Sequence, residues 1–131
     1  MSTKNLGAIP VYQKALELHE ISKAIASYVS FNKDVLKRYH SNSLRDNIAD
    51  SLVNDTVLIP KQIAQAEHSK SYAERLKSAS FINIMIRNIN SYCLGLEKDG
   101  VKEMEYLNLL RSEIKSFRKS FTKWRRTIRK D

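Results

Sequence analysis

Nine arginine and lysine residues crowd the last 21 positions of this 131-residue chain. They are Arg111, Lys115, Arg118, Lys119, Lys123, Arg125, Arg126, Arg129 and Lys130. Only Glu113 and Asp131 oppose them, so residues 111–131 carry a formal charge of +7 out of +9 for the whole chain. Guanidinium and ammonium groups at this density bind phosphate oxygens without reading a base sequence. The sequence therefore predicts that these nine residues bind a polyanion.

The apolar residues of the same segment are spaced like one face of an α-helix. They recur in steps of three and four at Met104, Leu107, Leu110, Ile114, Phe117, Phe121, Trp124 and Ile128. On a helical wheel the nine cations fall in one band beside this apolar face. We therefore expect a helix over residues 101–130 with its apolar side in a core and its basic side in solvent. Trp124 could stack on a base instead, but its place in the apolar face favours the core.

Residues that could carry out catalysis or bind a metal are few. The three histidines, His19, His40 and His68, all lack a glutamate three positions earlier, which a Glu-x-x-His metal site in a bundle requires. Cys93 lies among periodic apolar residues and is expected to be a small core residue. A glycine-rich phosphate loop is also missing. The sequence predicts a non-enzyme with no catalytic residues, no metal and no cofactor.

Three more helices are predicted upstream of the basic segment. The first follows Pro10, which suits a first helical position, and covers 11–29. The second begins after the N-cap Ser43 and contains Pro60, where we expect a kink or a restart. The third begins at a capping box made by Ser71 and Glu74 and ends before the turn at 98–100. We expect a flexible arm over residues 1–9, a short helical piece over 34–39 and a turn at 40–43.

These elements predict an all-α protein made of one domain, residues 1–131. Helices joined by short loops are antiparallel neighbours, so the expected architecture is an up-down-up-down four-helix bundle with long helices 3 and 4. The sequence has no apolar run long enough for a membrane span and no visible signal peptide. Its single cysteine suits a reducing compartment. We therefore expect a cytoplasmic protein.

Two features predict a homo-oligomer. The third helix has a second apolar stripe, Phe81, Met85 and Tyr92, which one bundle core does not easily cover. The last helix has a row of small hydroxyl residues at Ser112, Ser116, Ser120 and Thr127. Such a row lets another helix approach closely, although a solvated polar strip is the plain alternative. A head-to-tail interface whose rotation closes would give a ring.

Two segments also resemble a known family. Residues 57–66, VLIPKQIAQA, resemble the SIPxNIAEG segment of small four-helix-bundle proteins, and residues 11–15, VYQKA, resemble the VWQKA of their first helix. This family comprises the ribosomal RNA intervening-sequence proteins and the accessory variability determinants of diversity-generating retroelements. Trp124 is similar in placement to a tryptophan of the accessory proteins, whereas Gln65 and Ala66 stand where the family has Glu and Gly. The resemblance implies a homopentamer with a basic surface and, for the retroelement branch, binding to nucleic acid and to a reverse transcriptase.

Two classes of function fit the basic helix. The first is a nucleic-acid-binding accessory protein, with RNA favoured over DNA because backbone and shape carry much of RNA recognition. The second is a protein-interaction module or a module on an anionic membrane surface, since a basic amphipathic helix can also lie on lipid. The bundle needs the apolar face of this helix for its core, which favours nucleic acid.

Overall fold

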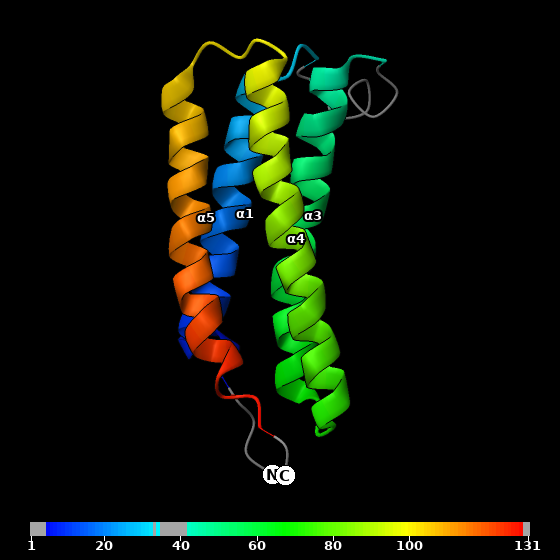
Figure 1. Ribbon diagram of the computed structural model, residues 1–131, viewed down its shortest axis with the longest axis vertical. Helices are drawn as coiled ribbons and strands as arrows, with labels where there is room; N and C mark the ends of the chain where they lie inside the picture. The colour runs from blue at the N-terminus through cyan, green and yellow to red at the C-terminus, as the bar shows by residue number, and fades with distance from the viewer. Residues whose placement is uncertain (1–4, 33, 35–41, 130–131) are drawn as a thin grey trace.

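The computed structural model describes residues 5–32, 34 and 42–129. Within these ranges the chain forms a 3₁₀ turn, η1 (Leu6–Ala8), and four α-helices: α1 (Pro10–Val29), α3 (Leu44–His68), α4 (Tyr72–Lys98) and α5 (Met104–Arg125). The four helices run alternately up and down (Figure 1). Each packs against two antiparallel neighbours, because α3 and α5 both contact α1 and α4. The predicted four-helix bundle is confirmed.

The helix ends follow from local sequence. The Ser43 hydroxyl accepts a hydrogen bond from the Asp46 N–H, and the Ser71 hydroxyl accepts one from the Glu74 N–H, each at 3.3 Å. These bonds satisfy N–H groups that have no partner in the first helical turn. At the other end of α4, Gly100 adopts a φ of +95°, which suits glycine. Val101 N–H then bonds back to the Leu96 carbonyl, so α4 ends in a Schellman motif.

Both predicted bounds of the basic helix were wrong. The stretch expected to be a flexible arm contains η1, a turn that the sequence did not predict, with a bond from Gly7 N–H to the Asn5 side chain. The basic helix begins at Met104 rather than residue 101, because the buried Val101 belongs to the Schellman motif. It ends at Arg125 rather than residue 130. At Pro60 we expected a kink or a restart; α3 continues through this buried proline as one helix, so the restart does not occur and the kink stays a prediction.

Some predictions lie outside the described residues. Apart from Asp34, the expected helical piece over 34–39 is among them. So are residues 1–4 of the arm, positions 40 and 41 of the turn, and Lys130 of the basic set.

The core lies along the axis of the bundle, and the apolar face of α5 supplies much of its volume. Six residues of that face are buried: Leu107, Leu110, Ile114, Phe117, Phe121 and Trp124. The rings of Phe117, Phe121 and Trp124 follow one another with centroids 6.1 Å apart. Met104 is exposed and Ile128 lies beyond the end of α5, so the buried stripe is shorter than predicted.

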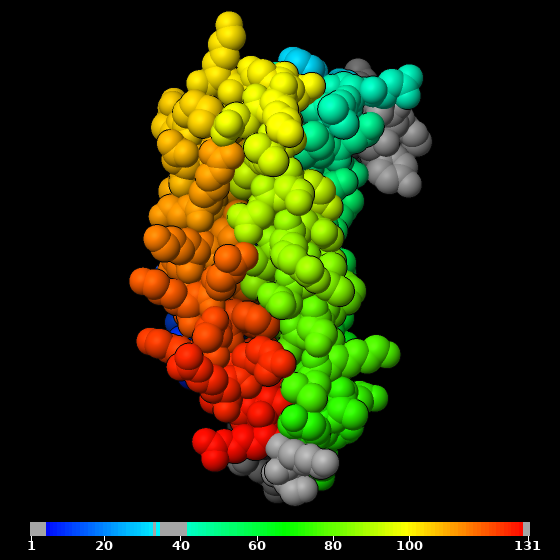
Figure 2. Space-filling model, in the orientation of Figure 1, coloured from blue at the N-terminus to red at the C-terminus, as the bar shows by residue number. Residues whose placement is uncertain are grey.

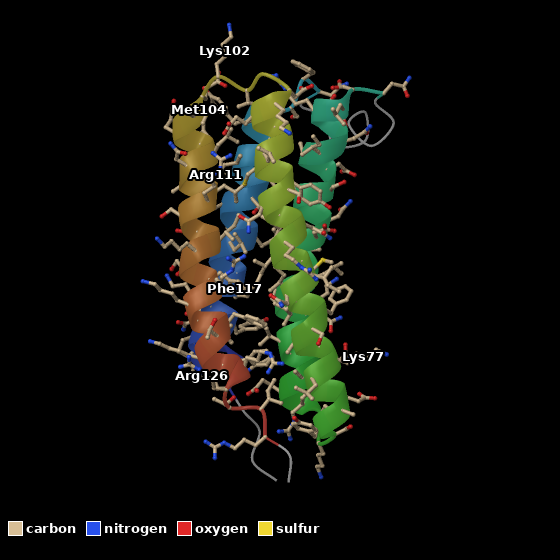
Figure 3. The ribbon with its side chains drawn as sticks, in the orientation of Figure 1. Lys77, Lys102, Met104, Arg111, Phe117 and Arg126 are labelled. Carbon is tan, nitrogen blue, oxygen red and sulfur yellow. The ribbon has the colours of Figure 1, made fainter. Side chains whose placement is uncertain are left out.

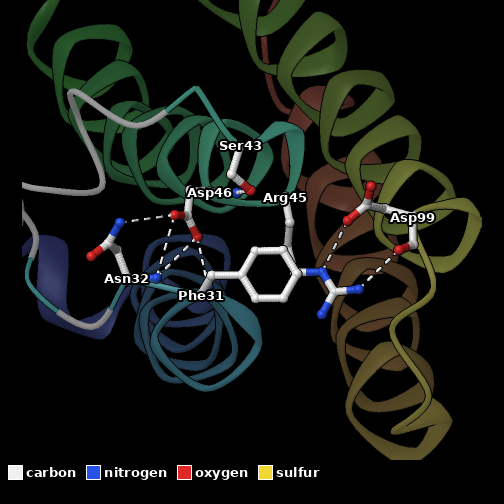
Figure 4. A network of polar contacts seen from close by, with 6 residues as sticks. All are labelled: Phe31, Asn32, Ser43, Arg45, Asp46 and Asp99. Atoms are coloured by element: carbon white, nitrogen blue, oxygen red, sulfur yellow. Dashed lines mark hydrogen bonds and ion pairs between the residues drawn. The ribbon is translucent and has the colours of Figure 1, made fainter.

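A polar network joins the segments at the end of the bundle where α1 ends and α3 begins, opposite the end of α5 (Figures 1 and 4). The fully buried Asp46 carboxylate accepts the N–H groups of Phe31, at 2.7 Å, and Asn32, at 3.3 Å. The Arg45 guanidinium donates to the Asp99 carboxylate at 3.0 Å and to the Asp99 carbonyl at 2.9 Å. It also lies 4.3 Å from the centre of the Phe31 ring. The first turn of α3 thereby holds the ends of α1 and α4.

We expect Asp46→Ala to reduce the free energy of unfolding by about 2–3 kcal/mol, because it leaves two backbone donors without their acceptor. Urea denaturation followed by circular dichroism measures the change. Ser43→Ala is the comparison, since it removes the N-cap acceptor of the same helical turn while keeping Asp46, and it is expected to cost about 1 kcal/mol. Equal losses in the two variants would mean that Asp46 acts only as part of the cap.

Candidate nucleic-acid interface

The basic residues lie on the solvent side of α5 and on the short segment that follows it. Six of the nine belong to α5, and Arg126 and Arg129 come directly after it. All eight of these are exposed except Arg111, which is partly buried. The lower half of α5 projects long side chains from the surface (Figure 2), and Arg126 points away from the bundle (Figure 3). We call the exposed members the basic band; they are Lys115, Arg118, Lys119, Lys123, Arg125, Arg126 and Arg129.

The basic band carries positive charge that the fold does not neutralise. Arg111 pairs with Glu97 of α4, with Nη2 and Oε1 2.8 Å apart. Among the described residues, no member of the basic band forms an ion pair. The charges of these side chains are therefore balanced only by anions from solution, which the phosphates of a ligand can replace.

A shallow hollow of about 480 Å³ lies within the basic band. Its lining residues are Lys115, Arg118, Lys119, Thr122, Lys123 and Arg126. Five of them belong to α5 and Arg126 is the residue that follows it, so the helix backbone largely sets their spacing. The aliphatic stems of the lysines and arginines form the walls of such a hollow while their charged heads stay in water.

The other side of α5 is occupied by the core. Trp124 is only 6% exposed, and its Nε1–H donates to a Glu67 carboxylate oxygen at 3.1 Å. This indole is therefore held between α5 and the end of α3 and is not presented to a base. Insertion of α5 into lipid would require its buried face to leave the core, which would expose the apolar faces of α1 and α4.

The predicted oligomer residues do not form one exposed surface. Met85 is only 7% exposed, Phe81 and Tyr92 are half-buried, and the Tyr92 hydroxyl donates to the Asp55 carboxylate of α3 at 2.5 Å. Burial and this hydrogen bond raise the pKa of Tyr92 to about 12. Within one chain the stripe is thus buried at Met85 and half covered at Phe81 and Tyr92, and its role as an oligomer interface stays a prediction.

The row of hydroxyl residues on α5 is partly covered as well. Ser116 and Ser120 are half-buried, and Ser120 lines a hollow together with Pro10 and Val11 of α1. Ser112 is exposed, and the Thr127 hydroxyl donates to the Trp124 carbonyl beyond the end of α5. Part of this row thus belongs to the contact between α5 and α1 within one chain.

The side chains considered for catalysis lie apart. The His19 Nδ1 is 3.0 Å from the hydroxyl of the buried Thr56, which links α1 to α3, and burial lowers the pKa of this imidazole. Burial also raises the pKa of the Cys93 thiol to about 11. In the described part of the chain, no three His, Cys, Asp or Glu side chains are grouped so as to hold a metal ion.

Comparisons with known proteins do not identify a family. A scan against protein-family models, a search of curated proteins and a search of solved structures each found no match to this chain. Over residues 5–32, 34 and 42–129, none of the helices is both long and apolar enough to pass through a membrane.

The sequence did not reveal which cation of the set is neutralised. Glu97 precedes Arg111 by fourteen positions, across the turn between α4 and α5, and only the packing of these two helices brings them together. The exposure of the remaining cations follows directly from their helical spacing.

Trp124 is the only tryptophan, so its fluorescence tests whether it lies in the core. We expect native protein to resist quenching by iodide and to emit at shorter wavelength than unfolded protein, because the indole is buried. Addition of RNA is expected to leave this emission unchanged. Strong quenching on RNA binding would show that the indole stacks on a base.

Proposed function

We propose that this protein is a non-enzymatic accessory protein that binds nucleic acid, RNA in preference to DNA, through the phosphate backbone. The main support for this proposal is that α5 presents unpaired cations on one side while its opposite side is buried in the core. A helix held in this way offers a rigid row of charges to a polyanion. Such contacts give affinity and orientation without base specificity.

The dimensions of the basic band suit a nucleic-acid strand. Lys115 and Arg126 are eleven positions apart, which corresponds to about 16 Å along a helix. Consecutive phosphates of one strand are about 3.4 Å apart along a duplex axis, so this length matches roughly five of them. RNA is the favoured ligand because backbone and shape provide much of its recognition.

The family resemblance supports an accessory role. Residues 57–66 and 11–15 resemble segments of the intervening-sequence proteins and of the retroelement accessory proteins. On that ground we also propose, for the retroelement branch, a reverse transcriptase as partner. A cytoplasmic setting is proposed as well, because the single cysteine suits a reducing compartment. The homopentamer implied by the resemblance is part of the same proposal.

Charge reversal in the basic band tests the binding proposal. We expect Lys119→Glu, Lys123→Glu and Arg126→Glu together to weaken binding to a single-stranded RNA roughly tenfold or more. The log–log salt dependence is expected to fall by about two units, at about 0.7 per lost phosphate contact. Fluorescence anisotropy over a series of salt concentrations measures both changes.

A matched variant separates local contacts from net charge. Lys61, Lys70 and Lys102 are exposed and lie outside α5, and their reversal to glutamate changes the net charge by the same amount. We expect this control to keep most of the affinity. Equal loss in both variants, with unchanged helicity, would reject the basic band as the binding surface. Displacement of bound RNA by anionic vesicles would instead favour the membrane-surface alternative.

A further inference from the structure

A hollow of about 330 Å³ lies where the beginning of α1 meets the end of α5. Its apolar lining comes from Ile9, Pro10 and Val11 at the start of α1 and from Trp124 of α5. Val11 and Trp124 are only 1% and 6% exposed, so the floor of the hollow belongs to the core. The volume is within the range of roughly 300–1,000 Å³ that is usual for small-molecule sites. We call this hollow the α1–α5 end pocket.

The polar groups of the α1–α5 end pocket are few, and one of them is charged. They are the hydroxyls of Ser120 and Thr127 and the ammonium of Lys123. Lys123 is exposed and has no ion-pair partner within the part of the chain that the structure describes. Glu67 accepts a hydrogen bond from the Trp124 indole but does not line the pocket. An apolar floor beside one free cation suits a ligand with an apolar body and a single negative charge.

Local sequence explains why this space is open. Ser120 has a short side chain and stands one turn before Trp124 on α5, so little of the space next to the indole is filled from this helix. Beyond the end of α5, the Thr127 hydroxyl donates to the Trp124 carbonyl, which turns the following segment back toward the helix. A large side chain at position 120 would fill the pocket without altering the charges around it.

We propose that the α1–α5 end pocket binds a small amphiphilic carboxylate. The apolar body of the ligand lies against Val11, Pro10 and Trp124, and its carboxylate lies beside the Lys123 ammonium. Removal of the apolar body from water supplies most of the affinity, at about fourfold for each buried CH₂ group. The cation supplies the selectivity, because it attracts an anion and repels an amphiphile of positive charge.

Lys123 also connects the α1–α5 end pocket to the basic band. The same side chain lines the hollow between the lysines and arginines of α5. A carboxylate beside its ammonium neutralises one charge of the basic band and takes the place of one phosphate. Bound carboxylate therefore weakens the binding of RNA. This consequence rests on the proposed nucleic-acid function, whereas the binding of the carboxylate does not.

Octanoate is the probe for the α1–α5 end pocket, and the emission of Trp124, the only tryptophan, reports its binding. We expect a saturable change in emission with a Kd on the order of 1 mM or below. Acetate lacks the apolar body and octylammonium has the opposite charge, so each is expected to bind roughly tenfold more weakly or worse. The absence of a saturable change with octanoate, or equal binding of either comparison compound, would overturn the proposal.

Three variants locate the bound octanoate. Ser120→Phe fills the pocket and is expected to abolish binding, and Lys123→Glu is expected to weaken it roughly fivefold or more. Lys115→Glu makes the same change in net charge eight positions earlier, about 12 Å along α5 and outside the pocket. This distance exceeds the screening length of about 8 Å at physiological salt, so we expect unchanged octanoate binding.

Circular dichroism checks the helicity of each variant. The two charge variants change exposed side chains and decide the location of the ligand even if Ser120→Phe does not fold. Full binding by folded Ser120→Phe, full binding by Lys123→Glu, or equal loss in both charge variants would overturn the proposed site.

Competition tests the link between the pocket and RNA. Saturating octanoate is expected to weaken RNA binding roughly threefold or more and to lower the log–log salt dependence by about 0.7, relative to sodium chloride of equal ionic strength. In Ser120→Phe, octanoate is expected to leave RNA binding unchanged. Unchanged RNA affinity in octanoate-saturated wild-type protein would overturn this link. Absence of RNA binding without octanoate would reject the nucleic-acid proposal and with it the link, while the octanoate titration still decides the pocket.

Discussion

The packing of the apolar face of α5 against the other helices is the interaction on which the structure depends. Its buried stripe closes the bundle between α1 and α4, and Phe117 at its centre has no exposed surface. Full burial of one such side chain contributes about 1.5–3 kcal/mol, and the stripe contains six. The same packing determines which way the cations point, since they lie on the opposite side of the same helix. The stability of the fold and the orientation of the basic band thus have one cause.

Polar contacts at both ends of the bundle hold α5 in register. At one end Arg45 of α3 binds Asp99, just before the turn that leads into α5. At the other end Trp124 of α5 donates to Glu67 of α3. The second contact joins α5 directly to α3, the helix that lies diagonally opposite it, whereas the first fixes the end of α4 from which the turn leads. A rotation or a slide of α5 that displaced the basic band would break the Trp124–Glu67 hydrogen bond as well as the apolar packing.

Much of the fold could be predicted because helical spacing and capping are local properties of the sequence. The caps at Ser43 and Ser71 and the buried stripe of α5 all depend on residues within a few positions of one another. Met85, which its spacing assigns to a second apolar stripe, is buried in the single chain because α4 meets both α3 and α5, so that its apolar sector is wider than a single stripe. The start of α5 was misplaced because Val101 continues the apolar pattern of the helix yet folds back onto Leu96.

The candidate site also has some features that local sequence predicts and others that depend on the packing of separate helices. The solvent-facing position of the basic band follows from the period of one helix. The Arg111–Glu97 pair depends on how α4 and α5 pack, which no local pattern records. In the same way, a hollow lined by Glu17, Glu20 and Glu113 was missed because the first two are far in sequence from the third and approach it only when α1 packs against α5.

Lysine footprinting tests most directly whether RNA contacts the basic band. Wild-type protein is acetylated with and without saturating single-stranded RNA, and the modification of each lysine is measured by mass spectrometry. If RNA contacts the basic band, Lys115, Lys119 and Lys123 become protected while Lys61 and Lys70 stay reactive. Protection of Lys61 and Lys70 with unchanged reactivity in α5 would contradict it.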